Sequence, residues 1–420
     1  MSKVALVIIS IFLLGGLLFR FFQFYHSNPT YHDGEEVSLV TTLQAEPLAS
    51  SGGQKFSFRT PVGQLISVTA DADPQLHYGQ IVTISGRLQS HSFEDGTSIL
   101  SLYHPMIVVK KASTDPLSAF AHVIKSRTET LYNKALPQIP ASLLMGIVFG
   151  SKEQFPANFW GDLQATGVLH VIAASGMNVT FVSAAMLYTL GFFFRRQTAL
   201  IIGSLGIIFY IFLVGFQASI LRASIMGLLA FGAGLLGRQH MAAIALVISG
   251  YVLLLWQPSF LFDVGFELSF MATLGILFLK PLIPLPDNFI TESFTTTLAA
   301  QLGTLPILLG VFGQIGLLSV LVNALVLWTV PLLMIFGSVA ALVGLAVPVV
   351  GELLVYPVLP FLVYFQSVVS YFGQSDWVFH VTDVSPIVWI GYYSLLIAWV
   401  FLKKKKIVLR SDPLSPKSVL

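Results

Sequence analysis

The order of apolar and polar residues changes twice along the chain. Residues 4–19 carry no charged side chain, and the apolar run continues past Arg20 to about residue 25. Such a run is long enough to cross roughly 30 Å of hydrocarbon. Lys3 in front of it is also typical of a signal sequence, but no small-residue cleavage site follows. We therefore expect a retained transmembrane helix over residues 1–25.

Residues 26–112 alternate between polar and apolar positions, the pattern that β-strands produce. Turn-rich segments separate five predicted strands at 37–44, 55–60, 64–70, 80–88 and 97–109. This number of short strands suits a small barrel of the OB type. The region has five Lys and Arg against eight Asp and Glu, a balance of about −3 that is the wrong sign for an electrostatic nucleic-acid site.

Residues 116–136 follow the pattern of an amphipathic helix, with Leu117, Phe120 and Leu131 at helical spacing and Lys125 among them. We expect this helix to lie at the membrane surface, although a helix packed on protein would show the same pattern. The apolar run 139–149 is too short to cross a bilayer, which predicts a re-entrant or interfacial segment. Both belong to an expected connecting region, residues 113–160.

Residues 161–403 consist almost entirely of long apolar runs and are expected to form one polytopic domain. The predicted spans are 168–194, 198–216, 218–237, 241–257, 263–280, 293–313, 316–345, 348–372 and 386–402. With the first helix the total is ten, so both termini share a side of the membrane. Arg and Lys at 195–196, 238, 280 and 403–406 fall on that side, which makes it cytoplasmic. The β domain is then external, and residues 404–420 form a short basic cytoplasmic tail.

The composition agrees with this organisation. Hydrophobic residues make up 55% of the 420 and charged residues only 10%, whereas soluble domains have roughly 25% charged residues. A soluble enzyme or a soluble nucleic-acid-binding domain is excluded for most of the chain. Without cysteine there is no disulfide, thiolate nucleophile or Cys-ligated metal. The predicted fold is an α-helical polytopic membrane protein of about ten spans, with a small external OB-like β domain after the first helix.

Four clusters of polar residues lie within the predicted spans, where each needs a physical reason. In the first, His170 begins an apolar helical pattern that Ser175 and Gly176 interrupt and Asn178 extends. An interrupted helix at membrane depth is tolerated where it meets protein or lines a wet cavity. A close helix contact through serine and glycine, with a satisfied histidine, explains these residues equally well.

The second and third clusters carry most of the charge. Gln217 and Arg222 lie beside a seam of small residues, Ser219, Ala223, Gly227, Ala230 and Gly234. Arg222 could snorkel outward, or face a polar pathway and bind phosphate. Asp263 and Glu267 are four residues apart and are expected to share a helix face. We favour their pairing with Arg222 over acid–base chemistry, because no nucleophile accompanies them.

The fourth cluster combines Gln301, Pro306 and Asn323. Pro306 lies in the middle of a predicted span and frees a backbone carbonyl. Kinks of this kind are common in channels and transporters, and also in ordinary helix packing.

Several longer motifs accompany these clusters. They are HYGQIVTISGRL (77–88), LLMGIVFGSKEQFP (143–156), ATGVLHVIAASGMNV (165–179), LRASIM (221–226), FDVGFELSFMAT (262–273), AAQLGTLPILLGVFGQIGLLSVLVN (299–323) and Pro331. In this order they resemble the ComEC/Rec2 family of inner-membrane channels for DNA uptake in natural transformation. The resemblance departs at Asn178, where the family usually has histidine, at Glu267, where it has glutamine, and at Gln80, where it has aspartate.

The resemblance implies that one DNA strand passes along a polar path between the spans, with Arg222, Gln217 and Asn178 as donors to its phosphates. It also implies partners: an external DNA receptor, a cytoplasmic ATPase or helicase, and the lipid bilayer. The family's metallo-β-lactamase-like nuclease motif, H-x-H-x-D-H, does not occur in this sequence. We therefore expect a channel and not an enzyme, without metal or cofactor, and any strand degradation by a separate nuclease. The oligomeric state stays open.

Three other functions fit some of the same residues. The membrane residues alone suit a transporter of another anionic substrate nearly as well. A non-transporting scaffold is a second alternative. The third is an intramembrane serine hydrolase, with Ser175 as nucleophile and His170 as base, although both would come from one broken helix.

Overall fold

The computed structural model describes residues 3–43, 47–50, 53–76, 80–92, 98–112, 116–151, 155–172, 175–283, 289–316, 318–374, 378–380 and 385–410. The chain divides into two compact units. The first comprises Met1–Val123 and Tyr251–Asp263, and the second Ile124–Gly250 and Val264–Leu420.

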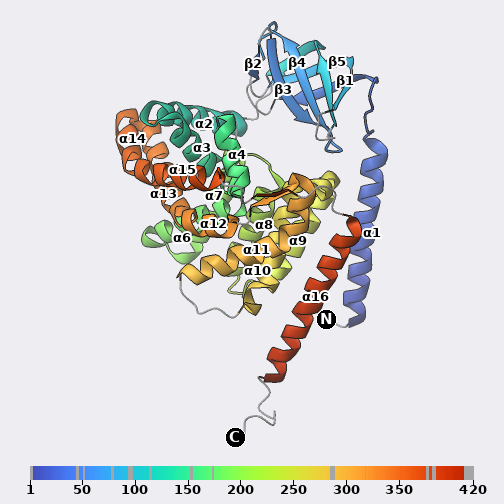
Figure 1. Cartoon of the computed structure of the whole chain (residues 1–420), viewed down its shortest axis with the longest axis vertical. Coiled ribbons are helices and arrows are strands. Elements are labelled where there is room, and N and C mark those ends of the chain that lie inside the picture. The colour runs from blue at the N-terminus through green and yellow to red at the C-terminus, as the bar shows by residue number, and fades with distance from the viewer. Residues whose placement is uncertain are drawn as a thin grey trace, which may run out of the picture. The chain divides into compact units, whose positions relative to one another are not determined.

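The first unit contains α1 (Lys3–Ser27) and a small β domain (Figure 1). Its strands are β1 (Glu36–Thr42), β2 (Leu48–Ser50), β3 (Gly53–Arg59), β4 (Leu65–Asp71), β5 (Gln80–Arg87), β6 (Gln89–Ser92), β7 (Ser98–Tyr103) and β8 (Met106–Ala112). One sheet has the order β1-β5-β8 and the other β2-β3-β4-β7-β6, with β4 and β7 parallel and the remaining pairs antiparallel. Only Leu88 separates β5 from β6, so this segment of chain takes part in both sheets.

The alternation of polar and apolar residues predicted the strands because each strand buries one of its two faces. Ile66, Val68, Val82 and Ile84 are fully buried and belong to one hydrophobic core. The prediction of a single strand over 97–109 is wrong: the chain breaks after β7 at His104, whose φ is 47°, and at a proline that cannot donate to a ladder. The short strands β2 and β6 were not predicted. Residues 44 and 97, at the ends of predicted strands, lie outside the described residues.

Hydrogen bonds hold other parts of the first unit to its segment Tyr251–Asp263, which includes the short helix η1 (Pro258–Phe262). The Arg20 Nε of α1 donates to the Leu255 carbonyl at 3.0 Å. The Gln257 amide nitrogen donates to the Pro61 carbonyl, in the turn between β3 and β4, at 3.0 Å. The first helix and the β domain are therefore both anchored to this segment.

In its described residues the second unit is helical, apart from one short two-stranded ribbon (Figure 1). It begins within α2 (Pro116–Ala135) and continues with α3 (Gln138–Phe149), α4 (Ala157–Ala165), α5 (Leu169–Ile172), α6 (Gly176–Phe193), α7 (Arg196–Val214), α8 (Ala218–Leu235), most of α9 (Ala242–Trp256), α10 (Val264–Phe278), η2 (Lys280–Leu282) and α11 (Phe289–Phe312). It ends with β9 (Gln314–Gly316), α12 (Ser319–Val326), α13 (Thr329–Ala346), α14 (Pro348–Val355), η3 (Tyr356–Val358), α15 (Leu359–Gly373), β10 (Val378–His380) and α16 (Pro386–Arg410).

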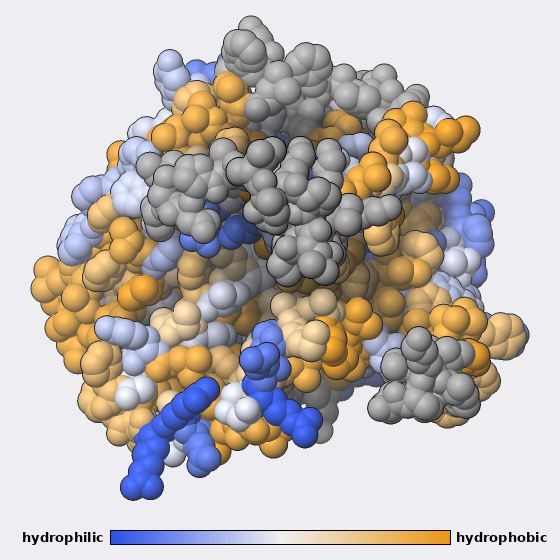
Figure 2. Space-filling view, turned by 90° about the horizontal axis from the view of Figure 1, so that it is seen from below, coloured by the Kyte–Doolittle hydropathy of each residue, from blue (hydrophilic) through white to orange (hydrophobic). Residues whose placement is uncertain are grey.

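Seven segments among the described residues are long and apolar enough to cross a membrane. They are Gly176–Phe193, Arg196–Val214, Ala218–Leu235, Val264–Leu282, Phe294–Val311, Thr329–Ala346 and Pro348–Gly373. Apolar side chains cover much of the face shown in Figure 2, as expected for a surface in contact with lipid. The chain is thus a multi-pass membrane protein. The total of ten spans stays a prediction, and α9, with 15 residues, is shorter than each of these seven segments.

The prediction of one continuous span over 316–345 is wrong. The structure has two helices there, α12 and α13, which are separated at Leu327 and Trp328. The cause lies four residues after Leu327, where Pro331 has no N–H to donate to the Leu327 carbonyl. A proline has a similar effect at Pro357, in the short helix η3 that interrupts the predicted span 348–372.

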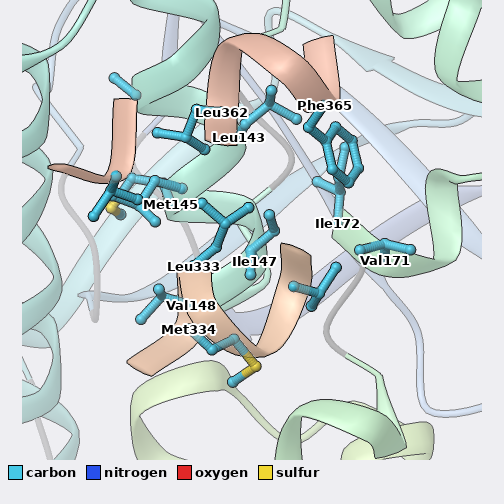
Figure 3. Close-up of a cluster of buried hydrophobic side chains, with 14 of the residues drawn as sticks. Leu143, Met145, Ile147, Val148, Val171, Ile172, Leu333, Met334, Leu362 and Phe365 are labelled. Carbon is cyan, nitrogen blue, oxygen red and sulfur yellow. The ribbon is translucent and has the colours of Figure 1, made fainter. Parts of the chain in front are cut away.

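The short helix α3 forms the centre of the second unit. Every residue from Pro140 to Phe149 is buried. Figure 3 shows its side chains among residues of α5, α13 and α15, namely Val171, Ile172, Leu333, Met334, Leu362 and Phe365. A helix that is apolar on all sides is normally enclosed by protein, which explains the apolar run 139–149.

The predicted amphipathic helix is α2, and its C-terminal half packs on protein. The hydroxyl of the fully buried Tyr132 donates to the Gly337 carbonyl of α13 at 2.8 Å, and Lys134 forms an ion pair with Glu352 of α14 at 2.6 Å. A position at the membrane surface stays a prediction for this helix. Its N-terminal half exposes Leu117, Phe120 and Val123.

Candidate functional site

The interruption predicted at Ser175 and Gly176 is present between α5 and α6. α5 ends at Ile172, and Ser175 has an extended backbone at the start of α6. Residues 173 and 174 lie outside the described residues. The His170 ring contacts the Gly167 carbonyl through Nδ1 at 3.0 Å. His170 and Asn178 thus belong to different helices and do not share one helical face.

Asn178 hydrogen-bonds to the C-terminal end of another helix. The last carbonyls of a helix have no partner within it, and those of α3 are buried. The Asn178 amide nitrogen donates to the Ile147 carbonyl at 3.0 Å, and the Tyr210 hydroxyl of α7 donates to the Val148 carbonyl at 3.2 Å. Asn178 is 0% exposed. Asn178 and Tyr210 therefore both cap α3. In the sequence, Tyr210 is marked only by having a hydroxyl group within an apolar run.

Replacing Asn178 with alanine should lower the melting temperature of the purified protein. The Ile147 carbonyl would stay buried without this donor, at a cost of about 1–3 kcal/mol. Asn178→His keeps a ring N–H and should recover part of the loss. Thr180→Ala is the control, since Thr180 is exposed two residues further along α6. Equal melting temperatures for Asn178→Ala and the control would contradict the capping role.

The Ser175 hydroxyl donates to the Asn178 side-chain oxygen at 3.3 Å. The contacts found for Ser175 and His170 therefore go to different partners and do not pair a nucleophile with a base, which argues against the hydrolase alternative. Within the described part of the chain no group of three or more His, Asp or Glu side chains is placed to hold a metal ion.

Arg222 is directed into the protein and does not snorkel outward. Its side chain is 7% exposed, its Nε donates to the Ser269 hydroxyl of α10 at 2.9 Å, and its Nη1 lies 3.2 Å from the Met226 sulfur. Gly176 of α6 also lies close to the Arg222 guanidinium: a methyl group on Gly176 would lie 2.8 Å from Nη2. These contacts contradict outward snorkelling of Arg222, and its binding to phosphate along a polar pathway stays a prediction. Gln217 lies apart, exposed at the start of α8.

The small-residue seam of α8 makes the predicted close helix contacts. A methyl group at Gly176 would lie 3.2 Å from the Ala223 Cβ. Methyl groups at Gly227 and Gly234 would lie 3.3 Å from Ile207 and Leu200 of α7, respectively. These distances are tighter than ordinary side-chain contacts, so α6 and α7 approach α8 as closely as the small residues allow.

The helix face expected for Asp263 and Glu267 is not formed. Asp263 lies after η1 with an extended backbone (φ −85°, ψ 120°), and α10 begins at the next residue, with Glu267 in its first turn. The contacts found for the Arg222 guanidinium are a hydroxyl and a thioether. Pairing of Arg222 with a carboxylate stays a prediction.

The fourth cluster joins α11 to its neighbours. The Gln301 amide nitrogen donates to the Ser319 hydroxyl of α12 at 2.6 Å. Pro306 lies inside α11 and leaves the Leu302 carbonyl without its helical donor, as predicted. This carbonyl accepts a hydrogen bond from Tyr392 of α16 at 2.7 Å. Ser319 and Tyr392 are not indicated by any local pattern in the sequence.

Asn323 of α12 is the other polar residue of this cluster. It is 1% exposed, and its side-chain oxygen is buried without a hydrogen-bond partner in the described structure. The Ser224 hydroxyl of α8, two residues from Arg222, is in the same situation. Buried polar atoms without partners are costly and rare, which marks both positions as places where a polar ligand or water would be stabilised.

Glycine contacts bring most of these residues into one connected region. Gly176 adjoins Arg222, and Ser269 connects Arg222 to α10. α10 and α11 approach closely at Gly275 and Gly303, where a methyl group on Gly303 would lie 3.3 Å from the Gly275 Cα. The polar residues of α6, α8, α10, α11 and α12 therefore lie on helices that pack one on the next.

Comparison with known proteins identifies the family. The model of the competence protein family matches residues 147–406, more than half of the chain. ComE operon protein 3 of Bacillus subtilis (strain 168) is 29% identical over 233 residues, which cover 55% of this chain and 29% of that protein. An uncharacterized protein of Aquifex aeolicus (strain VF5) is 30% identical over 181 residues, which cover 43% of this chain and 42% of that protein.

The chain thus spans less than half the length of these two relatives. No solved structure matches it. The family match begins within α3 and ends within α16, and so contains all four polar clusters. The chain belongs to the competence protein family.

Proposed function

We propose that this protein is a channel through which one strand of DNA crosses the bacterial cytoplasmic membrane during natural transformation. The observation that carries the proposal is the buried guanidinium of Arg222, whose contacts in the structure are the neutral side chains of Ser269 and Met226. A cation held inside a membrane protein is costly and usually functional. The planar donors of arginine suit phosphate, and membership of the competence protein family favours DNA as the cargo.

The path would run between the helices that carry the polar clusters. Arg222 would attract the phosphates of the strand. Asn178 contributes differently from the expectation, because its amide nitrogen donates to the Ile147 carbonyl and supports α3. Glu267 would repel DNA unless a neighbouring cation neutralises it.

The topology of the proposed channel follows from charge. Arg195, Arg196, Arg238 and Lys280 are best placed on the cytoplasmic side. With ten spans, both termini would be cytoplasmic and the β domain external. β1 pairs with β5, the chain continues from β5 into β6, and β6 pairs onward through β7, β4 and β3 to β2, which supports an OB-like barrel.

An external DNA receptor would deliver the strand, and a cytoplasmic ATPase or helicase would pull it. A separate nuclease could degrade the other strand.

The proposal is tested by entry of labelled DNA into a DNase-protected cytoplasmic pool. Cells with the gene deleted should lose the protected label, and cells with the gene restored should regain it. Unchanged label after deletion would refute DNA translocation and point to a different anionic cargo or to a scaffold.

A further inference from the structure

Two neighbouring tyrosines of α16 hydrogen-bond to the backbone of α11. The Tyr392 hydroxyl donates to the Leu302 carbonyl at 2.7 Å, and the Tyr393 hydroxyl donates to the Gly303 carbonyl at 3.1 Å. Both tyrosines are partly buried. Two side chains on one helix thus satisfy two consecutive carbonyls on another.

The Leu302 carbonyl needs such a donor because of Pro306. In a regular helix the N–H of residue 306 would donate to it, but proline has no N–H. A backbone carbonyl without a partner is strongly unfavourable in the hydrocarbon region, where no water can donate to it. The Tyr392 hydroxyl replaces the missing donor, so Pro306 and Tyr392 form a compensated pair across two helices.

The same face of α16 makes further contacts with the bundle. Trp389 lies three residues before Tyr392 and so shares its face. Its ring covers Gly310 of α11, where a methyl group would overlap the ring atoms. α16 is therefore docked on α11 along the two helical turns that contain the Pro306 break.

This part of α11 controls the geometry of the polar region. Gln301 precedes the freed carbonyl and donates to Ser319 of α12. Gly303 packs on α10, the helix whose Ser269 accepts from Arg222. A change in the shape of α11 here would move Gln301 and α10 together.

We propose that Tyr392 and Tyr393 are positioning residues of the translocation path. Their hydroxyls hold the Pro306 break of α11 in one shape, which keeps Gln301 on Ser319 and α10 against α11. The inference rests on the proposed channel function. Measurements of stability test the pairing of Tyr392 with the Pro306 break, and measurements of transport test the positioning role.

The first test is a double-mutant cycle on the purified protein, with Tyr392→Phe, Pro306→Ala and the two combined. Tyr392→Phe should lower the melting temperature by about 2 °C or more. In the Pro306→Ala background the N–H of residue 306 can donate to the Leu302 carbonyl. Adding Tyr392→Phe there should therefore lower the melting temperature by less than about half as much as it does in the wild type. Tyr371→Phe is the matched control, because Tyr371 is 77% exposed on α15. Equal losses in both backgrounds would overturn the pairing of Tyr392 with the break.

The second test measures uptake of labelled DNA per molecule of membrane protein. Tyr392→Phe should reduce uptake roughly fivefold, the change that one lost buried hydrogen bond produces in an equilibrium constant. The combined variant should take up as much as Pro306→Ala alone. If the first test shows that Tyr392 and Pro306 are coupled but Tyr392→Phe still takes up DNA fully, the positioning role is overturned. The proposed channel function would not be affected by that result. If the wild-type gene fails to restore uptake in deleted cells, the proposed channel function is overturned, whatever the melting temperatures show.

Discussion

Arg222→Gln should reduce DNA entry into the protected cytoplasmic pool by at least tenfold, with the protein still present in the membrane. Glutamine can still hydrogen-bond to Ser269, but it removes the buried positive charge of α8. A hydrogen bond to a charged group contributes about 1.5–3 kcal/mol, which corresponds to roughly a tenfold to hundredfold change in affinity. Arg222→Lys keeps the charge but loses the planar set of donors, so its uptake should be intermediate.

Arg238→Gln is the matched control, since it removes an exposed arginine from the loop after α8. Its uptake should equal that of the wild type. If Arg222→Gln takes up DNA as well as the control, Arg222 does not contact the cargo. Adding Glu267→Gln tests the predicted pairing: recovery of uptake in the double variant supports it, and no recovery counts against it.

Gly303→Val should strongly destabilise the protein, because α10 and α11 touch backbone to backbone at this position. A methyl group at Gly303 would lie 2.5 Å from the Met271 carbonyl oxygen and 3.3 Å from the Gly275 Cα. Backbone atoms cannot move aside as a flexible side chain can, so the helices would have to separate. Overpacking usually costs about 1–3 kcal/mol, and we expect a cost at or above the upper end, seen as a lower melting temperature and less protein in the membrane.

Gly391→Val is a matched control within α16. A methyl group at Gly391 would meet no atom within 4 Å. This variant should therefore melt close to the wild type. Similar melting temperatures for Gly303→Val and Gly391→Val would contradict the close contact between α10 and α11.

The elements of the β domain could be predicted largely because each long strand buries every second residue. Val68 and Ile84 are typical, with buried side chains at alternating positions of β4 and β5. The short strands β2 and β6 depend on pairing with partners that are distant in sequence. No local pattern predicts such pairings.

The apolar runs also predicted most helices of the second unit. The error at 316–345 arose from treating hydrophobicity as sufficient, although Pro331 indicated a break after Leu327. The candidate residues were polar side chains inside apolar runs, and most of them are buried or lie at helix contacts. Their partners could not be predicted, because Asn178 with Ile147 and Gln301 with Ser319 meet only through the packing of separate helices.

In the proposed channel, a water-accessible path for DNA passes beside Arg222. The chain has no native cysteine, so one conservative change, Ser269→Cys, reports on this position alone. Ser249→Cys is the control, because Ser249 is fully buried in α9. In cells that take up DNA, a charged, water-soluble thiol reagent should label Ser269→Cys, block uptake, and react more slowly while DNA is in transit. Ser249→Cys should not be labelled. A variant at Ser269 that supports uptake but resists the reagent would contradict the claim.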